Sequence, residues 1–159
     1  MNGFLPISKQ DMTDRGWYYC DFLIVTGDAY VDHPSFGTAI ISRVLEDAGY
    51  KVAILSQPDF RDEHDFLEMG RPRYAVLING GGSGTYQAAC LAKSMFEEEQ
   101  GEGKMTIEVI DSKTYTYIYG HIVVKAAEMR EQGESFDAIV SVVKSRLNRV
   151  EAYLGVYRL

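Results

Sequence analysis

The sequence is poor in the residues that build metal centres and has no long apolar run. It holds two cysteines, Cys20 and Cys90, and three histidines in 159 residues. The cysteine spacing fits neither a zinc site nor an iron–sulfur cluster, because both need closely spaced ligands. No apolar run approaches the roughly 20 residues of a membrane-spanning helix. We therefore expect two reduced thiols, no metal, no cofactor and no membrane partner.

Basic residues are also in short supply. Lys and Arg total 16 against 23 Asp and Glu, which gives a formal net charge of −7. A negative chain is repelled by nucleic acid and by anionic membrane surfaces, so we expect neither as a partner. The N-terminus, MNGFLPISKQDMTD, has no basic segment followed by an apolar one, which is the pattern of a secretory signal. These features predict a cytoplasmic protein.

What the chain does have is a regular alternation of short apolar runs and helical patterns. Strands are predicted at residues 22–26, 51–56, 73–79, 105–112 and 150–159, and long helices at 35–49, 85–99, 115–132 and 135–147. Strands separated by helices are typical of βα units and a parallel sheet. We predict one α/β domain over residues 1–159, a three-layer, doubly wound, flavodoxin-like or Rossmann-like fold with strand order 2-1-3-4-5. Val76, Leu77 and Ile78 should be buried, and the helix at 85–99 should turn Leu91 and Met95 inward.

Ligands of such folds bind at the carboxyl ends of the strands. A glycine-rich loop, NGGGSGT, follows the third strand there and precedes a helix. It matches neither a Walker A loop nor G-x-G-x-x-G. The free N–H groups of a helix N-terminus favour an anion, but Ser83 can equally cap the helix while the glycines only turn the chain. The candidate ligand-binding residues are Thr26, Asp28, Ser56, Asn79, Gly80, Gly81, Gly82, Ser83, Gly84 and Thr85. No catalytic arrangement stands out, so we expect no enzyme activity.

The first half resembles the N-terminal, cobalamin-binding-like domain of YgiQ-type radical SAM proteins over residues 4 to about 81. The matching text is FLPISKQDM, DFLIVTGDAYVDHPSFGTAIISRVLEDAGYKVAILSQPDF and DFLEMGRPRYAVLINGG. Radical SAM chemistry needs three closely spaced cysteines, which this chain lacks. The resemblance implies a cobalamin site of the form D-x-H-x-x-G, but the chain departs from it, because His33 directly follows Asp32.

The second half resembles the first domain of the DegV family, which binds a fatty acid between two domains. The matching text is SGTYQAACLAK, IEVIDSK, VVKAAEMREQGESFDAIV and RVEAYLGV, within residues 83–159. The resemblance implies a carboxylate held by hydroxyl groups at the strand ends. It therefore implies a small anion or a fatty acid as partner, although the second domain is absent.

Two resemblances in one chain favour an engineered or recombined chimera of residues 1–81 and 82–159, joined at the glycine loop and without evolved catalytic activity. Two alternatives stay open. One is a weak binder of carboxylates, fatty acids or phosphates at the glycine loop, and the other is a cobalamin- or nucleotide-binding accessory domain. Apolar surface left bare by missing elements would favour a homodimer.

Overall fold

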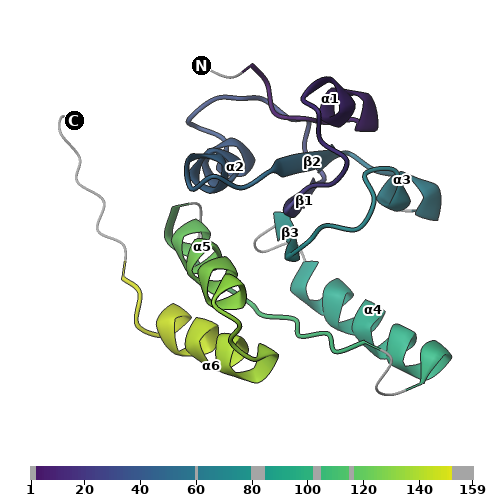
Figure 1. Ribbon diagram of the computed structural model, residues 1–159. Helices are drawn as coiled ribbons and strands as arrows, with labels where there is room; N and C mark the ends of the chain where they lie inside the picture. The colour runs from purple at the N-terminus through teal and green to yellow at the C-terminus, as the bar shows by residue number, and fades with distance from the viewer. Residues whose placement is uncertain (1–2, 60, 80–84, 102–104, 115–116, 152–159) are drawn as a thin grey trace, which may run out of the picture.

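The computed structural model describes residues 3–59, 61–79, 85–101, 105–114 and 117–151. Figure 1 shows a small sheet with helices on both of its faces. The elements in chain order are α1 (Lys9–Asp14), β1 (Phe22–Thr26), α2 (Gly37–Asp47), β2 (Val52–Ser56), α3 (Glu63–Leu67), β3 (Ala75–Asn79), α4 (Thr85–Gln100), α5 (Tyr117–Glu131) and α6 (Phe136–Leu147). The protein is therefore a mixed α/β protein, as the sequence predicts.

The sheet has three parallel strands in the order β2-β1-β3. This order agrees with the first three places of the predicted arrangement. The register sets Thr26, the last residue of β1, opposite Ser56 on one side and Asn79 on the other. All three strands consequently end at the same level of the sheet.

The predicted five-stranded sheet is not formed by the described residues. The segment 105–112 joins no β-ladder, and most of the fifth predicted strand, residues 152–159, lies outside the described ranges. The segment contacts two helices through Glu108. Its carboxylate forms ion pairs with Lys93 of α4, at 3.8 Å, and with Lys144 of α6. The segment is therefore held between helices instead of pairing with β3.

One face of the sheet is covered by α2 and α5. Their apolar side chains share a core with β1, β2 and the N-terminal arm. The buried members of this core are Leu5, Phe22, Ile24, Ile41, Leu45, Val52, Ile54 and Ala127. Since Ala127 belongs to α5, the helices of the second half of the chain contribute to the same core as the first half.

The other face is covered only in part. A second core forms where α1 and the end of α3 cross β1 and β2, and its buried members are Met12, Cys20, Leu23, Ala53, Leu55 and Met69. This core stops before β3, where Val76 is 50% exposed and Ile78 is 49% exposed. The prediction that these two residues are buried is therefore wrong.

Helix α4 explains part of this exposure. Figure 1 shows α4 extending away from the sheet instead of returning across the face that carries Val76 and Ile78. Leu91 is 62% exposed and Met95 is 52% exposed. The prediction that Leu91 and Met95 point inward is accordingly wrong, because the surface they were expected to cover is not beneath them.

The N-terminal arm closes the outer edge of β2. The backbone N–H of Ile54 donates a hydrogen bond of 2.8 Å to the carbonyl of Pro6, and Leu5 is buried beside it. Helix α1 follows, and Ser8 caps it by accepting a hydrogen bond from the N–H of Asp11 at 3.2 Å. A Ser N-cap satisfies a donor that would otherwise lack a partner in the first helical turn.

Candidate functional site

The carboxyl ends of β1 and β2 bring together three of the predicted ligand-binding residues. The Ser56 hydroxyl donates a hydrogen bond of 3.0 Å to the carbonyl of Asp28. The N–H of Asp28 donates to the Thr26 hydroxyl at 3.2 Å, and the N–H of Tyr30 donates to the Ser56 hydroxyl at 3.0 Å. Thr26 is buried and Asp28 is exposed. The two hydroxyl groups thus hold the loop after β1 in place at the strand ends.

Gln57 adds an unusual backbone conformation to this edge. It follows β2 directly with φ of 51°, and its N–H donates a hydrogen bond of 2.8 Å to the carbonyl of Thr26. A positive φ is uncommon outside glycine and is often found at functional sites. The turn after β2 is therefore fixed against the end of β1.

The other predicted site residues are only partly described. Asn79 ends β3 and Thr85 begins α4, which confirms the predicted strand–loop–helix order. The glycine loop itself, Gly80, Gly81, Gly82, Ser83 and Gly84, lies outside the described residues. The predicted anion site therefore stays a prediction at this loop.

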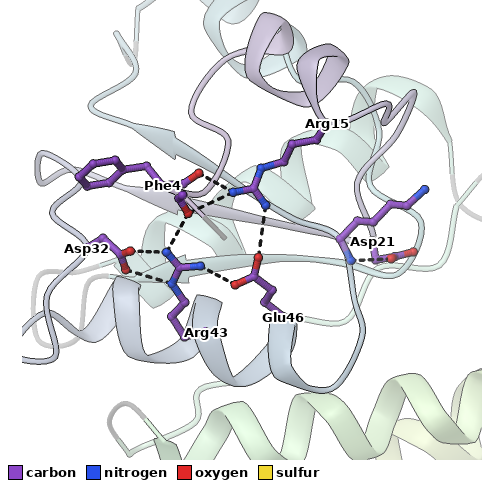
Figure 2. A network of polar contacts seen from close by, with 8 residues as sticks. Phe4, Arg15, Asp21, Asp32, Arg43 and Glu46 are labelled. Carbon is purple, nitrogen blue, oxygen red and sulfur yellow. Dashed lines mark hydrogen bonds and ion pairs between the residues drawn. The ribbon is translucent and has the colours of Figure 1, made fainter. Parts of the chain in front are cut away.

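A polar network that the sequence did not predict lies on the same side of the molecule as the N-terminal arm (Figure 2). Arg43 of α2 forms ion pairs with Asp32 and with Glu46, and it donates a hydrogen bond of 3.1 Å to the carbonyl of Gly3. Arg15 forms an ion pair of 3.2 Å with Glu46 and donates to the carbonyl of Gly3 at 3.2 Å. The two guanidinium groups fix the arm to α2.

The charges of this network are tied to one another. The hydrogen bond from Arg43 lowers the pKa of the Asp32 carboxyl below its ordinary value, and the same contact raises the pKa of Arg43. Both groups are consequently charged over the whole range in which proteins normally fold. The network is structural, since its donors and acceptors are already engaged with each other.

The neighbouring His33 takes part in a turn. Its ring Nδ1 accepts a hydrogen bond of 3.1 Å from the N–H of Ser35, and its ring lies edge-on to Phe36 with centroids 6.5 Å apart. The imidazole is exposed. His33 is therefore a surface turn residue, which agrees with its departure from the D-x-H-x-x-G spacing.

The two cysteines do not form a metal site. Cys20 is 0% exposed, and burial raises the pKa of its thiol to about 11. Cys90 lies in α4 and is partly exposed. No group of three or more potential metal-ligating side chains occurs among the described residues. A radical SAM cluster is held by three cysteine thiolates, so the donor set of this chain does not fit that cluster.

Two surface cavities lie away from the strand ends. One of about 510 Å³ lies between α4, the segment 105–108 and α6, and one of about 480 Å³ lies beside the N-terminal arm. The first is lined by Lys93, Glu108 and Lys144, which are already paired with one another.

No helix in the described part of the chain is long and apolar enough to cross a bilayer.

The described residues form a parallel α/β unit with two hydroxyl groups at its strand ends. The family described as Radical SAM N-terminal matches residues 4–90, more than half of the chain. The chain belongs to this family. This confirms the predicted resemblance of the first half to radical SAM N-terminal domains.

Similar proteins are found in Clostridium. A UPF0313 protein of Clostridium perfringens (strain SM101 / Type A) is 65% identical over 80 residues, which are 50% of this chain and 12% of that protein. A UPF0313 protein of Clostridium botulinum (strain 657 / Type Ba4) is 58% identical over 78 residues, which are 49% of this chain and 12% of that protein. The match thus spans about an eighth of these relatives. No solved structure matches the chain.

These findings overturn the expectation of an engineered or recombined chimera. The relatives are natural bacterial proteins, so the chain belongs to an evolved family. The family match also continues through the glycine loop into α4, as far as Cys90. The family and these relatives do not support the resemblance of residues 83–159 to the DegV family.

Proposed function

We propose that this chain is a non-catalytic domain of the Radical SAM N-terminal family. It contributes a folded α/β unit and carries out no radical chemistry of its own. The proposal rests on the position of Cys20, one of the two cysteines, in a completely buried site at the edge of the second core. The raised pKa keeps its thiol protonated, and a thiol is a poor metal ligand. With Cys90 alone remaining, three thiolates are not available.

The length of the relatives also supports a non-catalytic role for the matched segment. The matched segment is only 12% of the perfringens protein. On this proposal the residues that hold a cluster and bind S-adenosylmethionine in such proteins lie in the remaining length. The hydroxyl groups of Thr26 and Ser56 fit a supporting role, since they stabilise their own loop.

Anaerobic reconstitution with iron and sulfide tests the proposal. We expect this chain to acquire no cluster, judged by iron content and by the visible absorption of iron–sulfur centres, and to leave S-adenosylmethionine intact. The full-length perfringens UPF0313 protein, treated in the same way, is the positive comparison. Stoichiometric cluster binding that disappears in Cys90→Ser would contradict the proposal.

A second candidate function is binding of a small polar ligand at the strand ends. It is supported by the assembly of Thr26, Asp28 and Ser56 beside Gln57, whose backbone has a positive φ. Titration with inorganic phosphate, followed by the amide NMR signals of Asp28 and Ser56, tests this idea. Shifts should exceed those caused by sodium chloride and should disappear in Ser56→Ala. Equal shifts with both salts would rule this ligand out.

A further inference from the structure

The two edges of the sheet are finished differently. The outer edge of β2 is closed by the N-terminal arm, through the hydrogen bond from Ile54 to Pro6. The outer edge of β3 carries no strand among the described residues. Figure 1 shows the N-terminal arm and α1 on the β2 side of the sheet. An open edge presents unpaired backbone groups, which are a template for a further strand.

The side chains of β3 show which surface a partner would cover. Ala75 and Leu77 pack against the core beneath α2 and α5. Val76 lies beside Leu23 in the register, yet Val76 is 50% exposed while Leu23 is 4% exposed. The apolar surface of this face therefore continues from the core out to the edge, where it meets solvent.

The backbone of β3 shows which groups a partner would bind. The N–H of Phe22 donates a hydrogen bond of 3.2 Å to the β2 side, so the next residue, Leu23, turns its backbone groups to β3. Leu23 stands opposite Val76 in the register, and a residue of a parallel ladder bonds the two neighbours of its partner, which here are Ala75 and Leu77. The backbone groups of Val76, and of Ile78 two residues on, therefore point to the open edge.

Nothing in the sequence of β3 protects this edge. Proteins usually blunt a free edge with a charged side chain, a proline or a bulge. Residues 75–79 read AVLIN and contain none of these. The strand is paired with β1 at every residue, without a bulge. The edge is therefore regular, uncharged and apolar.

We propose that β3 pairs with β3 of a second copy of this chain, antiparallel, about a two-fold axis at Leu77. The strand is complementary to itself in this arrangement. Ala75 faces Asn79 of the second copy, while Val76 and Ile78 supply the backbone groups that are directed to the open edge. Val76 faces Ile78 of the second copy, so β-branched side chains form cross-strand pairs. No charged side chain is opposed to another within the paired strands.

The same axis also brings the exposed apolar surfaces together. A two-fold axis perpendicular to the sheet keeps corresponding faces on the same side. Val76 and Ile78 of both copies then form one continuous apolar surface across the junction. The result is a six-stranded sheet that closes the bare edge of each copy. This inference does not depend on the proposed lack of catalysis.

Sedimentation equilibrium tests the proposal with the chain as it is. We expect a dimer for the unaltered chain and a monomer for the double variant Val76→Lys, Ile78→Lys, with an unchanged far-ultraviolet circular dichroism spectrum. Val31→Lys is the matched control, because Val31 is also an exposed apolar residue, at 44%, but lies outside β3. It should remain dimeric.

Hydrogen exchange adds a measurement that needs no variant. In the dimer the amides of Val76 and Ile78 should exchange about tenfold more slowly than after dilution to the monomer, since they gain strand hydrogen bonds. The amides of Ala75 and Leu77, whose backbone groups face β1 in both states, should change little. A chain that stays monomeric would overturn the proposal. So would a dimer without this alternating pattern, or a monomer that instead binds the remainder of a clostridial UPF0313 protein along β3.

Discussion

The Tyr74 hydroxyl donates a hydrogen bond to a carboxylate oxygen of Glu131 at 2.7 Å, across 57 positions of sequence. It joins the residue before β3 to the last residue of α5. The Tyr74 ring also lies edge-on to Tyr50, with centroids 5.7 Å apart, and tilted against Phe22 at 5.6 Å. Tyr74 thus belongs to an aromatic cluster at the amino end of the sheet and connects it to α5 through the hydrogen bond to Glu131.

Replacement of Tyr74 by Phe should keep this aromatic packing and remove only the hydrogen bond. We expect the free energy of unfolding to fall by about 0.5–1.5 kcal/mol, the usual contribution of one hydrogen bond. Urea denaturation followed by circular dichroism provides the measurement. Tyr18→Phe is the control, because Tyr18 is 97% exposed and its replacement should change nothing. Equal effects of the two variants would show that the Tyr74 contact does not stabilise the fold.

Tyr119 should make the protein sensitive to alkali. Its hydroxyl is buried without a hydrogen-bond partner among the described residues, and burial raises its pKa from the ordinary 10 to about 12. The folded state therefore keeps a proton that the unfolded state loses. Stability from this group is complete below pH 10 and is lost as the pH rises towards 12. Tyr119→Phe should weaken that loss.

The same variant should not destabilise the protein at neutral pH. Removing a buried hydroxyl that lacks a partner relieves a desolvation cost, so a gain of up to about 1 kcal/mol is expected. Urea denaturation curves at neutral and alkaline pH measure both effects. A loss of stability at neutral pH would indicate that the hydroxyl is hydrogen-bonded in solution.

Arg43→Gln should release the N-terminal arm from α2. The variant loses its ion pairs with Asp32 and Glu46, whose side chains are partly exposed, and we expect a cost of about 1–2 kcal/mol. Arg61→Gln removes an exposed ion pair with Asp59 and should have no measurable effect. Thermal unfolding of the two variants compares them directly.

The dependence of stability on acidic pH is a second measurement that tests the Arg43 prediction. Because the pKa of Asp32 is lowered in the folded state, the stability it contributes is present above its ordinary pKa of 3.8 and is lost as the pH falls below that value. The Arg43→Gln variant should lose less stability on acidification than the unaltered chain does. An identical acid dependence would place the stabilising contact elsewhere.

The two faces of the sheet should respond differently to truncation. Ile24 is 0% exposed at the centre of the core beneath α2, and Ile24→Ala should cost about 2–5 kcal/mol. Val76 is 50% exposed, and under conditions where the chain is monomeric Val76→Ala should cost about 1 kcal/mol or less. Chemical denaturation at low protein concentration measures both. Comparable costs would mean that the face around Val76 is covered in solution.

Local signals in the sequence predicted the elements whose formation depends on neighbouring residues. The helix predicted at 135–147 begins at Ser135, which caps it by accepting a hydrogen bond from the N–H of Ala138 at 3.2 Å. The helix ends at Leu147, as predicted. The first three strands also lie where short apolar runs predicted them. Such features need only a few adjacent residues, which periodicity and capping preferences describe well.

Features that depend on distant contacts were not predictable in the same way. The segment 105–112 has the alternation of a strand, but it joins no β-ladder and pairs through Glu108 with α4 and α6, which are distant in the sequence. The network around Arg43 joins residues as far apart as Gly3 and Glu46, which no local pattern connects. The strand-end residues Thr26, Asp28 and Ser56 were predictable, because parallel strands bring their carboxyl ends to one edge. The sequence did not predict whether these residues hold a ligand or only their own loop, since hydroxyl groups suit both.

The hydrogen bond between Pro6 and Ile54 limits how far this sheet can polymerise. A sheet with two open edges can add further copies at both edges and form a fibre. A sheet with one open edge pairs with a single partner, and no open edge is then left. Because the N-terminal arm covers the edge of β2, the proposed pairing through β3 ends at a dimer. An extended aggregate would need a second open edge in each copy.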